Sequence, residues 1–145
     1  MRLILQRVSR AEVRVDGETV GEIGRGLLVL AGVERGDGSE QAVKAAVKLT
    51  GLRVFDDREG KMNLNLAQVG GSVLLVSQFT LAGSLDRGRR PSFERAAAPE
   101  LAAPLIERLA GELEQRSVPV ACGRFGARME VESVNDGPVT FVLDL

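Results

Sequence analysis

The sequence predicts a single α+β domain over residues 1–145, in which a mostly antiparallel β-sheet or barrel packs with two main helices. Three observations support this fold. The chain has 145 residues, the usual size of one domain. Most of its apolar segments alternate or form short continuous runs, as strands do, and only two repeat with the period of a helix. Hydrophobic residues make up 44% and charged residues 27%, which is ordinary for a globular protein.

The first strands follow one another closely. Residues 3–15 alternate between apolar and polar side chains, and Asp16-Gly17 is a turn signal before a return strand over residues 18–24. Residues 26–33, GLLVLAGV, are a continuous apolar run. This pattern is typical of a buried central strand.

Two segments have helical patterns. Residues 40–51 place apolar side chains on one face, with Ser39 as the expected N-cap and Gly51 at the end. The second helix is expected over residues 99–116, because Pro99 suits the first helical position. Leucines recur there every four residues, at Leu101, Leu105, Leu109 and Leu113.

The remaining strands lie around the second helix. Residues 52–55 predict a short strand and residues 72–81, SVLLVSQFTL, a second buried one. After the second helix, strands are expected over residues 118–126, 127–134 and 138–145, with the strand breakers of NDGP between the last two.

Composition limits the chemistry. The absence of histidine excludes Ser-His-Asp and Cys-His arrangements, and with Cys122 as the single cysteine we expect no metal site and no cofactor. The absence of Trp and Tyr argues against a base-stacking sheet, and a net charge of −1 gives no global attraction to nucleic acid. The lone cysteine and the lack of a signal peptide or membrane span indicate the cytoplasm.

The SQFTL segment is the first candidate site. Ser77, Gln78, Phe79 and Thr80 follow four apolar residues at the end of the expected strand. In a continued strand, Gln78 and Thr80 would share one face, where a hydroxyl and an amide suit a carbonyl oxygen or a water. The alternative is that these groups only satisfy backbone atoms where the strand ends.

The GRFGARM segment is the second candidate. Gly126 allows close approach of the backbone, and Phe125 and Met129 are suited to wall a small apolar pocket. The alternative is a bulged strand with core side chains.

The NDGPVT segment is the third candidate, with Gly137-Pro138 at its centre. Its first residues are strong turn formers, and a Gly-Pro bond can be cis, as about 5–6% of X–Pro bonds are in folded proteins. The alternative is an ordinary hairpin turn.

The RGRRPSF segment is the fourth candidate. Arg87, Arg89 and Arg90 are the one concentrated basic patch of the sequence, and guanidinium groups suit phosphate. The alternative is a solvated polar loop.

Together these segments resemble the D-aminoacyl-tRNA deacylase family, whose members hydrolyse D-amino acids from mischarged tRNA. The resemblance covers the whole chain, through QRV, SQFTL, RRPSF, GRFGA and NDGPVT in this order. It implies a homodimer with active sites at the subunit interface, acting on tRNA without a cofactor, a membrane or another protein partner. It also implies that Gly137-Pro138 is cis and enters the partner's site, and that Arg7 holds this turn. The implied pocket residues are Ser77, Gln78, Phe79 and Thr80, with Phe125 and Met129 nearby.

The resemblance makes chiral discrimination the central task. Backbone carbonyls of Gly137-Pro138 would exclude an L side chain, and glycine would pass, so glycyl-tRNA is an expected second substrate. Two mechanisms stay open. Thr80 is a nucleophile, or the substrate's 2′-hydroxyl activates water while Thr80 orients groups; the missing base favours the second. Backbone N–H groups near Phe79 and Thr80, with Gln78 assisting, are candidates for holding the oxyanion.

Two rival functions remain. A binding module for a tRNA acceptor end would use the arginine loop but leaves the polar SQFTL segment unexplained. An unrelated ester hydrolase would need a histidine or a G-x-S-x-G elbow, and the sequence has neither.

Overall fold

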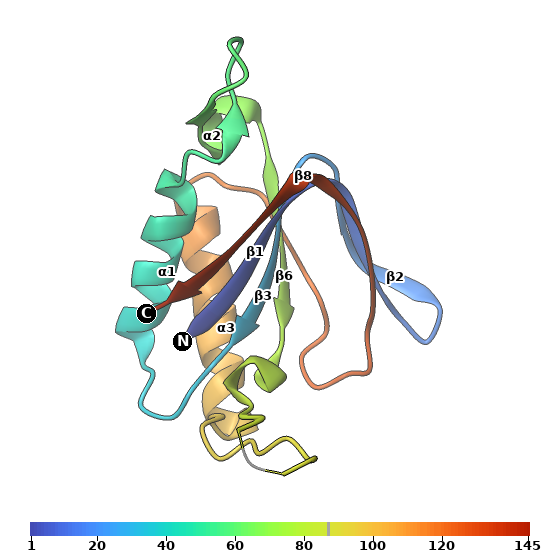
Figure 1. Ribbon diagram of the computed structural model, residues 1–145, viewed down its shortest axis with the longest axis vertical. Coiled ribbons are helices and arrows are strands. Elements are labelled where there is room, and N and C mark those ends of the chain that lie inside the picture. Colours follow the sequence, from blue (N-terminus) through green and yellow to red (C-terminus); the bar gives the residue numbers. More distant parts are fainter. Residues whose placement is uncertain (87) are drawn as a thin grey trace.

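A computed structural model describes residues 1–86 and 88–145. Its centre is a six-stranded sheet in the order β2-β1-β3-β6-β7, with β8 paired to the other side of β1. The strands of this sheet are β1 (Arg2–Val15), β2 (Glu18–Ile23), β3 (Gly26–Gly32), β6 (Ser72–Ser77), β7 (Val120–Cys122) and β8 (Glu130–Asp144). The helices α1 (Ser39–Gly51) and α3 (Pro99–Gln115) lie together against the sheet (Figure 1).

Smaller elements complete the chain. A separate hairpin of β4 (Phe55–Asp56) and β5 (Met62–Leu64) precedes the short helix α2 (Leu66–Val69). A 3-10 turn, η1 (Phe79–Ala82), follows β6 directly. No helix among the described residues is both long and apolar enough to cross a membrane.

The expected α+β class with two main helices is confirmed, and the sheet is mixed. Strand β1 pairs antiparallel with β2, β3 and β8, whereas β3, β6 and β7 run parallel to one another. Parallel neighbours need a crossover connection, and α1 and α3 lie in the two crossovers. The periodicity of single segments could not reveal this, because it does not fix strand direction.

The sheet curls until β2 approaches β7. A Cβ atom added to Gly21 of β2 would lie only 2.7 Å from the carbonyl oxygen of Cys122 in β7. A side chain at this position would therefore push the strands apart. The close approach agrees with the sheet or barrel that the sequence predicts.

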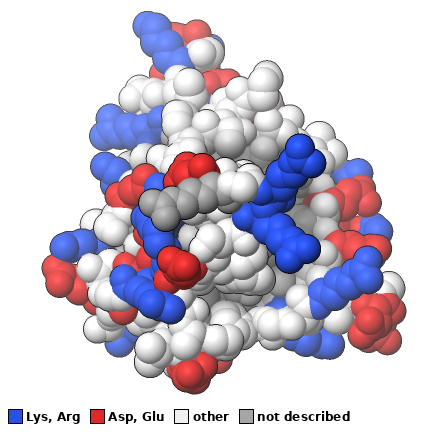
Figure 2. All heavy atoms as spheres, turned by 60° about the horizontal axis from the view of Figure 1, so that its bottom comes forward, with Lys and Arg blue, Asp and Glu red and all other residues white. Residues whose placement is uncertain are grey.

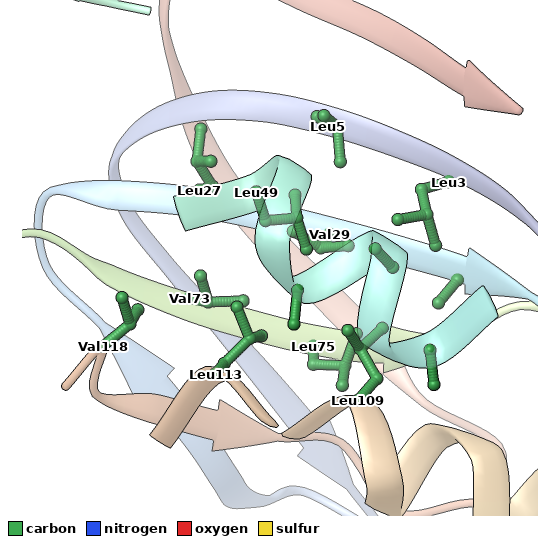
Figure 3. Packing of buried hydrophobic residues seen from close by; sticks show 14 of the residues in the cluster. Leu3, Leu5, Leu27, Val29, Leu49, Val73, Leu75, Leu109, Leu113 and Val118 are labelled. Atoms are coloured by element: carbon green, nitrogen blue, oxygen red, sulfur yellow. The ribbon is translucent and has the colours of Figure 1, made fainter. Parts of the chain in front are cut away.

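Alternation along β3 and β6 divides the core between the two faces of the sheet. Leu27, Val29, Val73 and Leu75 face the helices and join a cluster with Leu49, Leu109 and Leu113 from α1 and α3 (Figure 3). The side chains between them in sequence face the inside of the curl, in a second cluster of Val8, Ala11, Val13, Ile23, Leu28, Leu74 and Val76. Both faces of the central strands are therefore buried, as their continuous apolar runs predict.

The helices begin close to the expected residues, but two details of the prediction are wrong. Gly38 is the N-cap of α1, and Ser39 is the first helical residue. In α3 the expected stripe holds at Leu109 and Leu113, whereas Leu101 is 64% exposed. Ala102 and Ile106 face the core in its place, because the buried stripe follows i, i+3 and i+4 steps rather than a strict spacing of four.

Several strand predictions need correction at their ends. The strand expected over residues 72–81 ends at Ser77, the one over 52–55 starts only at Phe55, and the one over 118–126 is limited to Val120–Cys122. The two strands expected over 127–134 and 138–145 are one strand, β8. The hairpin-turn alternative for NDGP is therefore wrong, since tertiary contacts hold both flanks of the segment against β1.

Candidate active site

A cavity of about 560 Å³ lies at the carboxyl ends of β3 and β6. It extends over the start of α3 and under the loop that leads into β8. Its lining is mostly apolar, with Ser77 and Gln78 as the polar side chains. The lining residues are Ala31, Val33, Val76, Ser77, Gln78, Phe79, Ala97, Pro99, Ala102, Ile106, Phe125, Gly126, Ala127, Met129 and Val131.

The structure thus brings two sequence candidates to one cavity. Ser77, Gln78 and Phe79 of the SQFTL segment lie on one side, and Phe125 and Met129 of the GRFGARM segment on the other. The bulged-strand alternative for the second segment is wrong, since residues 123–129 form a loop rather than a strand.

Turn η1 is fixed against the end of β3. The Gln78 N–H donates to the Ala31 carbonyl over 2.8 Å, and the Leu81 N–H returns to the Gln78 carbonyl over 3.1 Å. A Cβ atom on Gly32 would come within 2.8 Å of Leu81 Cβ and 3.0 Å of the Gln78 oxygen. Glycine at position 32 therefore lets η1 pack directly on the strand.

The turn leaves donors near the cavity. Gln78 Nε2 donates to Thr80 Oγ1, so these side chains orient one another although they do not share a strand face. Among the described residues, the N–H groups of Phe79 and Thr80 have no hydrogen-bond partner, as expected at the start of a 3-10 helix. Thr80 itself does not line the cavity but stands beside it through Gln78.

The loop between β7 and β8 is anchored at both ends. The Gly123 N–H donates to the Leu75 carbonyl over 2.9 Å, and Met129 lies so close that a Cβ on Gly123 would meet its sulfur at 2.6 Å. Between them the Ala127 N–H donates to the Arg124 carbonyl over 3.2 Å. Gly126 has φ +74° at the third position of this turn, where glycine is favoured.

An aromatic pair stands beside η1. The rings of Phe79 and Phe93 meet edge to face, with centroids 5.0 Å apart. A Cβ on Gly83 would lie 3.0 Å from the Phe93 ring and 2.9 Å from the Thr80 carbonyl, so this glycine allows the contact. Because Phe79 is 59% exposed, its ring presents apolar surface to an incoming ligand.

Electrostatically the cavity is neutral. None of its lining residues carries an ionisable side chain. Burial, followed by the charge of Glu114, raises the pKa of the Cys122 thiol, which disfavours a thiolate nucleophile. The described residues contain no group of three or more carboxylate or cysteine side chains placed to hold a metal ion.

The Gly137-Pro138 segment bulges out of β8. Gln6 pairs with Thr140 and Val8 with Asn135, so four residues of β8, 136–139, stand opposite one residue of β1. The peptide bond between Gly137 and Pro138 is cis, Gly137 has φ +146°, and both residues are exposed.

Side chains from both strands hold the base of this bulge. Asn135 Nδ2 donates to the carbonyls of Arg7 at 2.9 Å and Val139 at 3.3 Å. Arg7 Nε donates to the Asp136 carbonyl over 3.0 Å and lies 3.3 Å from its carboxylate. Arg7 is buried, and its Nη1 also binds the Val54 carbonyl and the Asp56 carboxylate.

The bulge lies away from the cavity of its own chain. Arg7 pairs with Leu27 at the start of β3, whereas the cavity begins at Ala31. Four residues along a strand correspond to roughly 13 Å. Neither Gly137 nor Pro138 lines the cavity.

The arginine loop, residues 84–92, follows η1 in the chain. Ser84 and Ser92 exchange two backbone hydrogen bonds that close its base, and Arg89 and Arg90 are exposed within it. Arg87 lies outside the described residues.

The D-Tyr-tRNA(Tyr) deacylase family model matches residues 4–144. The chain belongs to this deacylase family. Proteins named D-aminoacyl-tRNA deacylase are similar over nearly the whole length. That of Anaeromyxobacter dehalogenans is 57% identical over 99% of this chain and 97% of its own. The protein of Geobacter sulfurreducens is 54% identical over 99% of this chain and 95% of its own length.

Two solved structures have the same fold as this chain. The c-Myc DNA unwinding element binding protein matches with a TM-score of 0.94 and 36% identity, covering 100% of this chain and 99% of that one. A probable eukaryotic D-amino acid tRNA deacylase has the same fold, with a TM-score of 0.84 and 20% identity over 99% of this chain and 98% of its own.

Part of the cavity wall has no signal in the sequence. The wall formed by Ala31, Val33, Ala97 and Ile106 is assembled from strand ends and a helix that are far apart in sequence, and nothing local marks it. Gly32 and Asn135, by contrast, could have been identified from the sequence. A glycine ending a buried strand indicates a close backbone approach, and an asparagine beside Gly-Pro can satisfy carbonyls that the bulge exposes.

Proposed function

We propose that the protein hydrolyses the ester bond of D-aminoacyl-tRNA, releasing a free D-amino acid and tRNA. The observation that carries this proposal is the cavity between η1 and residues 123–129, in a chain of the D-Tyr-tRNA(Tyr) deacylase family. Its volume of about 560 Å³ falls in the range of small-ligand sites. An aminoacylated terminal adenosine is a ligand of this size, and the reaction belongs where charged tRNA is used, in the cytoplasm.

The free N–H groups of η1 suit the charge that develops during hydrolysis. When water attacks the ester carbonyl, its oxygen becomes an oxyanion, and the bond to the ribose oxygen then breaks. Among the described residues the N–H groups of Phe79 and Thr80 have no partner, and the Gln78–Ala31 bond holds the start of their turn, so they would receive the oxyanion without rearrangement. The ribose hydroxyl leaves with a proton, and the carboxylate of the amino acid is released.

The proton from water needs an acceptor, and the cavity lining offers none. We propose that the adjacent 2′-hydroxyl of the substrate relays this proton: it accepts the proton from water while it passes its own proton to the leaving ribose oxygen. Thr80 is held by Gln78 and would orient groups rather than attack, because no base stands within its described hydrogen bonds. An acyl-threonine adduct trapped by acid quench would contradict this assignment.

We infer that the Gly137-Pro138 bulge acts in the cavity of a second copy of the chain. It is exposed, it lies at the other end of the sheet from its own cavity, and no cavity residue comes from it. Within the described part of the chain, strand β8 pairs with β1 alone and so forms an edge of the sheet, with exposed apolar side chains that include Val131, Val134, Phe141 and Val142. A long apolar edge is a liability for a monomer, which favours a two-fold dimer along this strand.

In such a dimer the backbone of the bulge would face the α-carbon of the substrate. Backbone carbonyls cannot rotate aside as side chains do, so they would exclude an L side chain whatever its identity. A D side chain would point away from them. Glycine has no side chain to exclude, so glycyl-tRNA, including that mischarged on tRNA-Ala, would also be hydrolysed.

Single-turnover hydrolysis of matched D-tyrosyl-, L-tyrosyl- and glycyl-tRNA tests the proposed function. We expect rapid release from the D and glycyl esters and release from the L ester at the rate without enzyme. Binding of all three without release would instead identify a tRNA-binding module.

A further inference from the structure

Two arginines frame the loop that lines the far side of the cavity. Arg124 and Arg128 immediately flank Phe125, Gly126 and Ala127, which all contribute to the cavity. The hydrogen bond from the Ala127 N–H to the Arg124 carbonyl and the anchor at Gly123 fix this turn. Both guanidinium groups are therefore carried on a held backbone at the edge of the cavity.

These arginines are free to bind an external anion. Both are exposed, and neither takes part in an ion pair among the described residues. Other arginines, such as Arg10 and Arg14 on β1, are paired with carboxylates. The loop over residues 123–129 contains no acidic residue.

Arg89 and Arg90, in the loop that follows η1, are also exposed and take part in no ion pair among the described residues, although Asp86 and Glu94 lie in the same segment. Figure 1 places both loops at the lower end of the molecule, in yellow and orange. Figure 2 turns this end forward and shows both basic and acidic side chains around an uncharged central area. The arginines of both loops therefore lie at one end of a chain whose net charge is −1.

We propose that Arg124 and Arg128 bind the phosphate on the 5′ side of the substrate's terminal adenosine. The inference rests on the proposed function, and it names the residues that bind the substrate phosphate nearest to the ester. Arg124 and Arg128 each adjoin a cavity residue in sequence, so they lie within reach of the first phosphate outside the cavity. Arg89 and Arg90 are separated from the nearest cavity residues by several positions and reach phosphates further along the tRNA. The guanidinium group is the side chain best suited to such contacts.

Two short esters test this assignment. They are the D-tyrosyl esters of adenosine and of adenosine 5′-monophosphate, which differ only in the phosphate. The measured quantity is the ratio of their kcat/KM values. We expect the wild type to favour the phosphate-bearing ester by about tenfold, the usual size of a charge-assisted hydrogen-bond contribution.

The double variant Arg124→Gln/Arg128→Gln should bring this ratio close to one. The matched control is Arg58→Gln, an exposed arginine in the β4–β5 hairpin at the opposite end of the molecule (Figure 1), which should keep the wild-type ratio. The ratio compares two substrates on one preparation, so partial unfolding lowers both rates and leaves it unchanged.

The possible outcomes distinguish a failure of the phosphate assignment from a failure of the proposed function. If the wild type hydrolyses neither these esters nor D-tyrosyl-tRNA, the proposed function fails and the inference fails with it. If both are hydrolysed equally well, or if the double variant keeps the preference, the function stands and the phosphate assignment is wrong. A preference that disappears in Arg89→Gln/Arg90→Gln instead would place the phosphate on the other loop and also overturn it.

Discussion

Arg7 Nε lies 3.0 Å from the carbonyl oxygen of Asp136, the residue directly before Gly137. The same guanidinium binds the Val54 carbonyl and the Asp56 carboxylate, so one buried side chain ties the bulge of β8 to the segment that leads from α1 into β4. This contact makes the orientation of Gly137-Pro138 depend on the folded core.

Arg7→Lys should therefore loosen the bulge. Lysine cannot reproduce the fork of contacts, and we expect a loss of about 1–3 kcal/mol in the free energy of unfolding. The ratio of D- to L-tyrosyl-tRNA hydrolysis should fall as well. Asp56→Asn is the matched control, because it weakens one partner of Arg7 and leaves the bond to Asp136. Urea denaturation and the two rates measure both effects, and an unchanged D/L ratio in Arg7→Lys would separate this arginine from chiral selection.

Gly137→Ala should damage activity more than stability. Gly137 has φ +146°, and an added Cβ would lie 2.6 Å from the Val139 nitrogen and 2.7 Å from its side chain, so the bulge must move. Because the bulge is exposed, we expect the thermal midpoint to change little while D-tyrosyl-tRNA hydrolysis drops by at least about tenfold.

Gly17→Ala is the control for Gly137→Ala. Gly17 also has positive φ, +83°, but its Cβ would meet nothing within 4 Å. It lies in the β1–β2 turn, away from the bulge. Wild-type activity in both variants would show that the backbone of the bulge plays no part in the reaction.

Gly32→Ala should displace η1. The added Cβ would meet Leu81 Cβ at 2.8 Å and the Gln78 oxygen at 3.0 Å, so the N–H groups of Phe79 and Thr80 would shift relative to the cavity. We expect kcat to fall by about 10²-fold, the usual effect of losing an oxyanion donor, with a smaller change in KM. Gly24→Ala, which meets nothing within 4 Å, is the control. A wild-type kcat in a folded Gly32→Ala protein would place the oxyanion elsewhere.

The dependence of rate on pH should reflect the substrate rather than the protein. The described cavity lining has no ionisable side chain, so we expect no enzyme group to titrate in kcat between about pH 5 and 9. A D-tyrosyl ester should show the pKa of its own ammonium group. The matching hydroxy-acid ester, which lacks that group, should lose this inflection. An inflection that persists with the hydroxy-acid ester would reveal a general base.

The sequence predicted the elements whose patterns are local. Residues 3–15 alternate and form β1, and the apolar repeats of α1 and α3 identified both helices within two residues of their ends. The end of β6 was mispredicted because contacts with Ala31 and Gly32, distant in sequence, stop the strand and start η1. Likewise, NDGP has turn chemistry, yet Arg7 and Asn135 keep it within one continuous strand.

The sequence indicates cavity residues only where they belong to a recognisable local motif. SQFTL and GRFGARM identified two walls of the cavity, whereas Val33, Ala97 and Ile106 have no distinguishing local pattern. Arg124 and Arg128 form no basic cluster in the sequence, because Phe125, Gly126 and Ala127 separate them. Only the fold shows that their loop and the arginine loop lie at the same end of the molecule (Figure 1).

Combining two impaired variants in one dimer tests the central claim that each active site combines the cavity of one chain with the bulge of another. Gly32→Ala impairs the cavity, and Gly137→Ala impairs the bulge. A heterodimer purified through two different affinity tags would contain one site in which both parts are intact. Our account predicts recovery of about half the wild-type rate of D-tyrosyl-tRNA hydrolysis per dimer, since a two-fold dimer has two sites. A heterodimer no more active than its two parents would contradict the account.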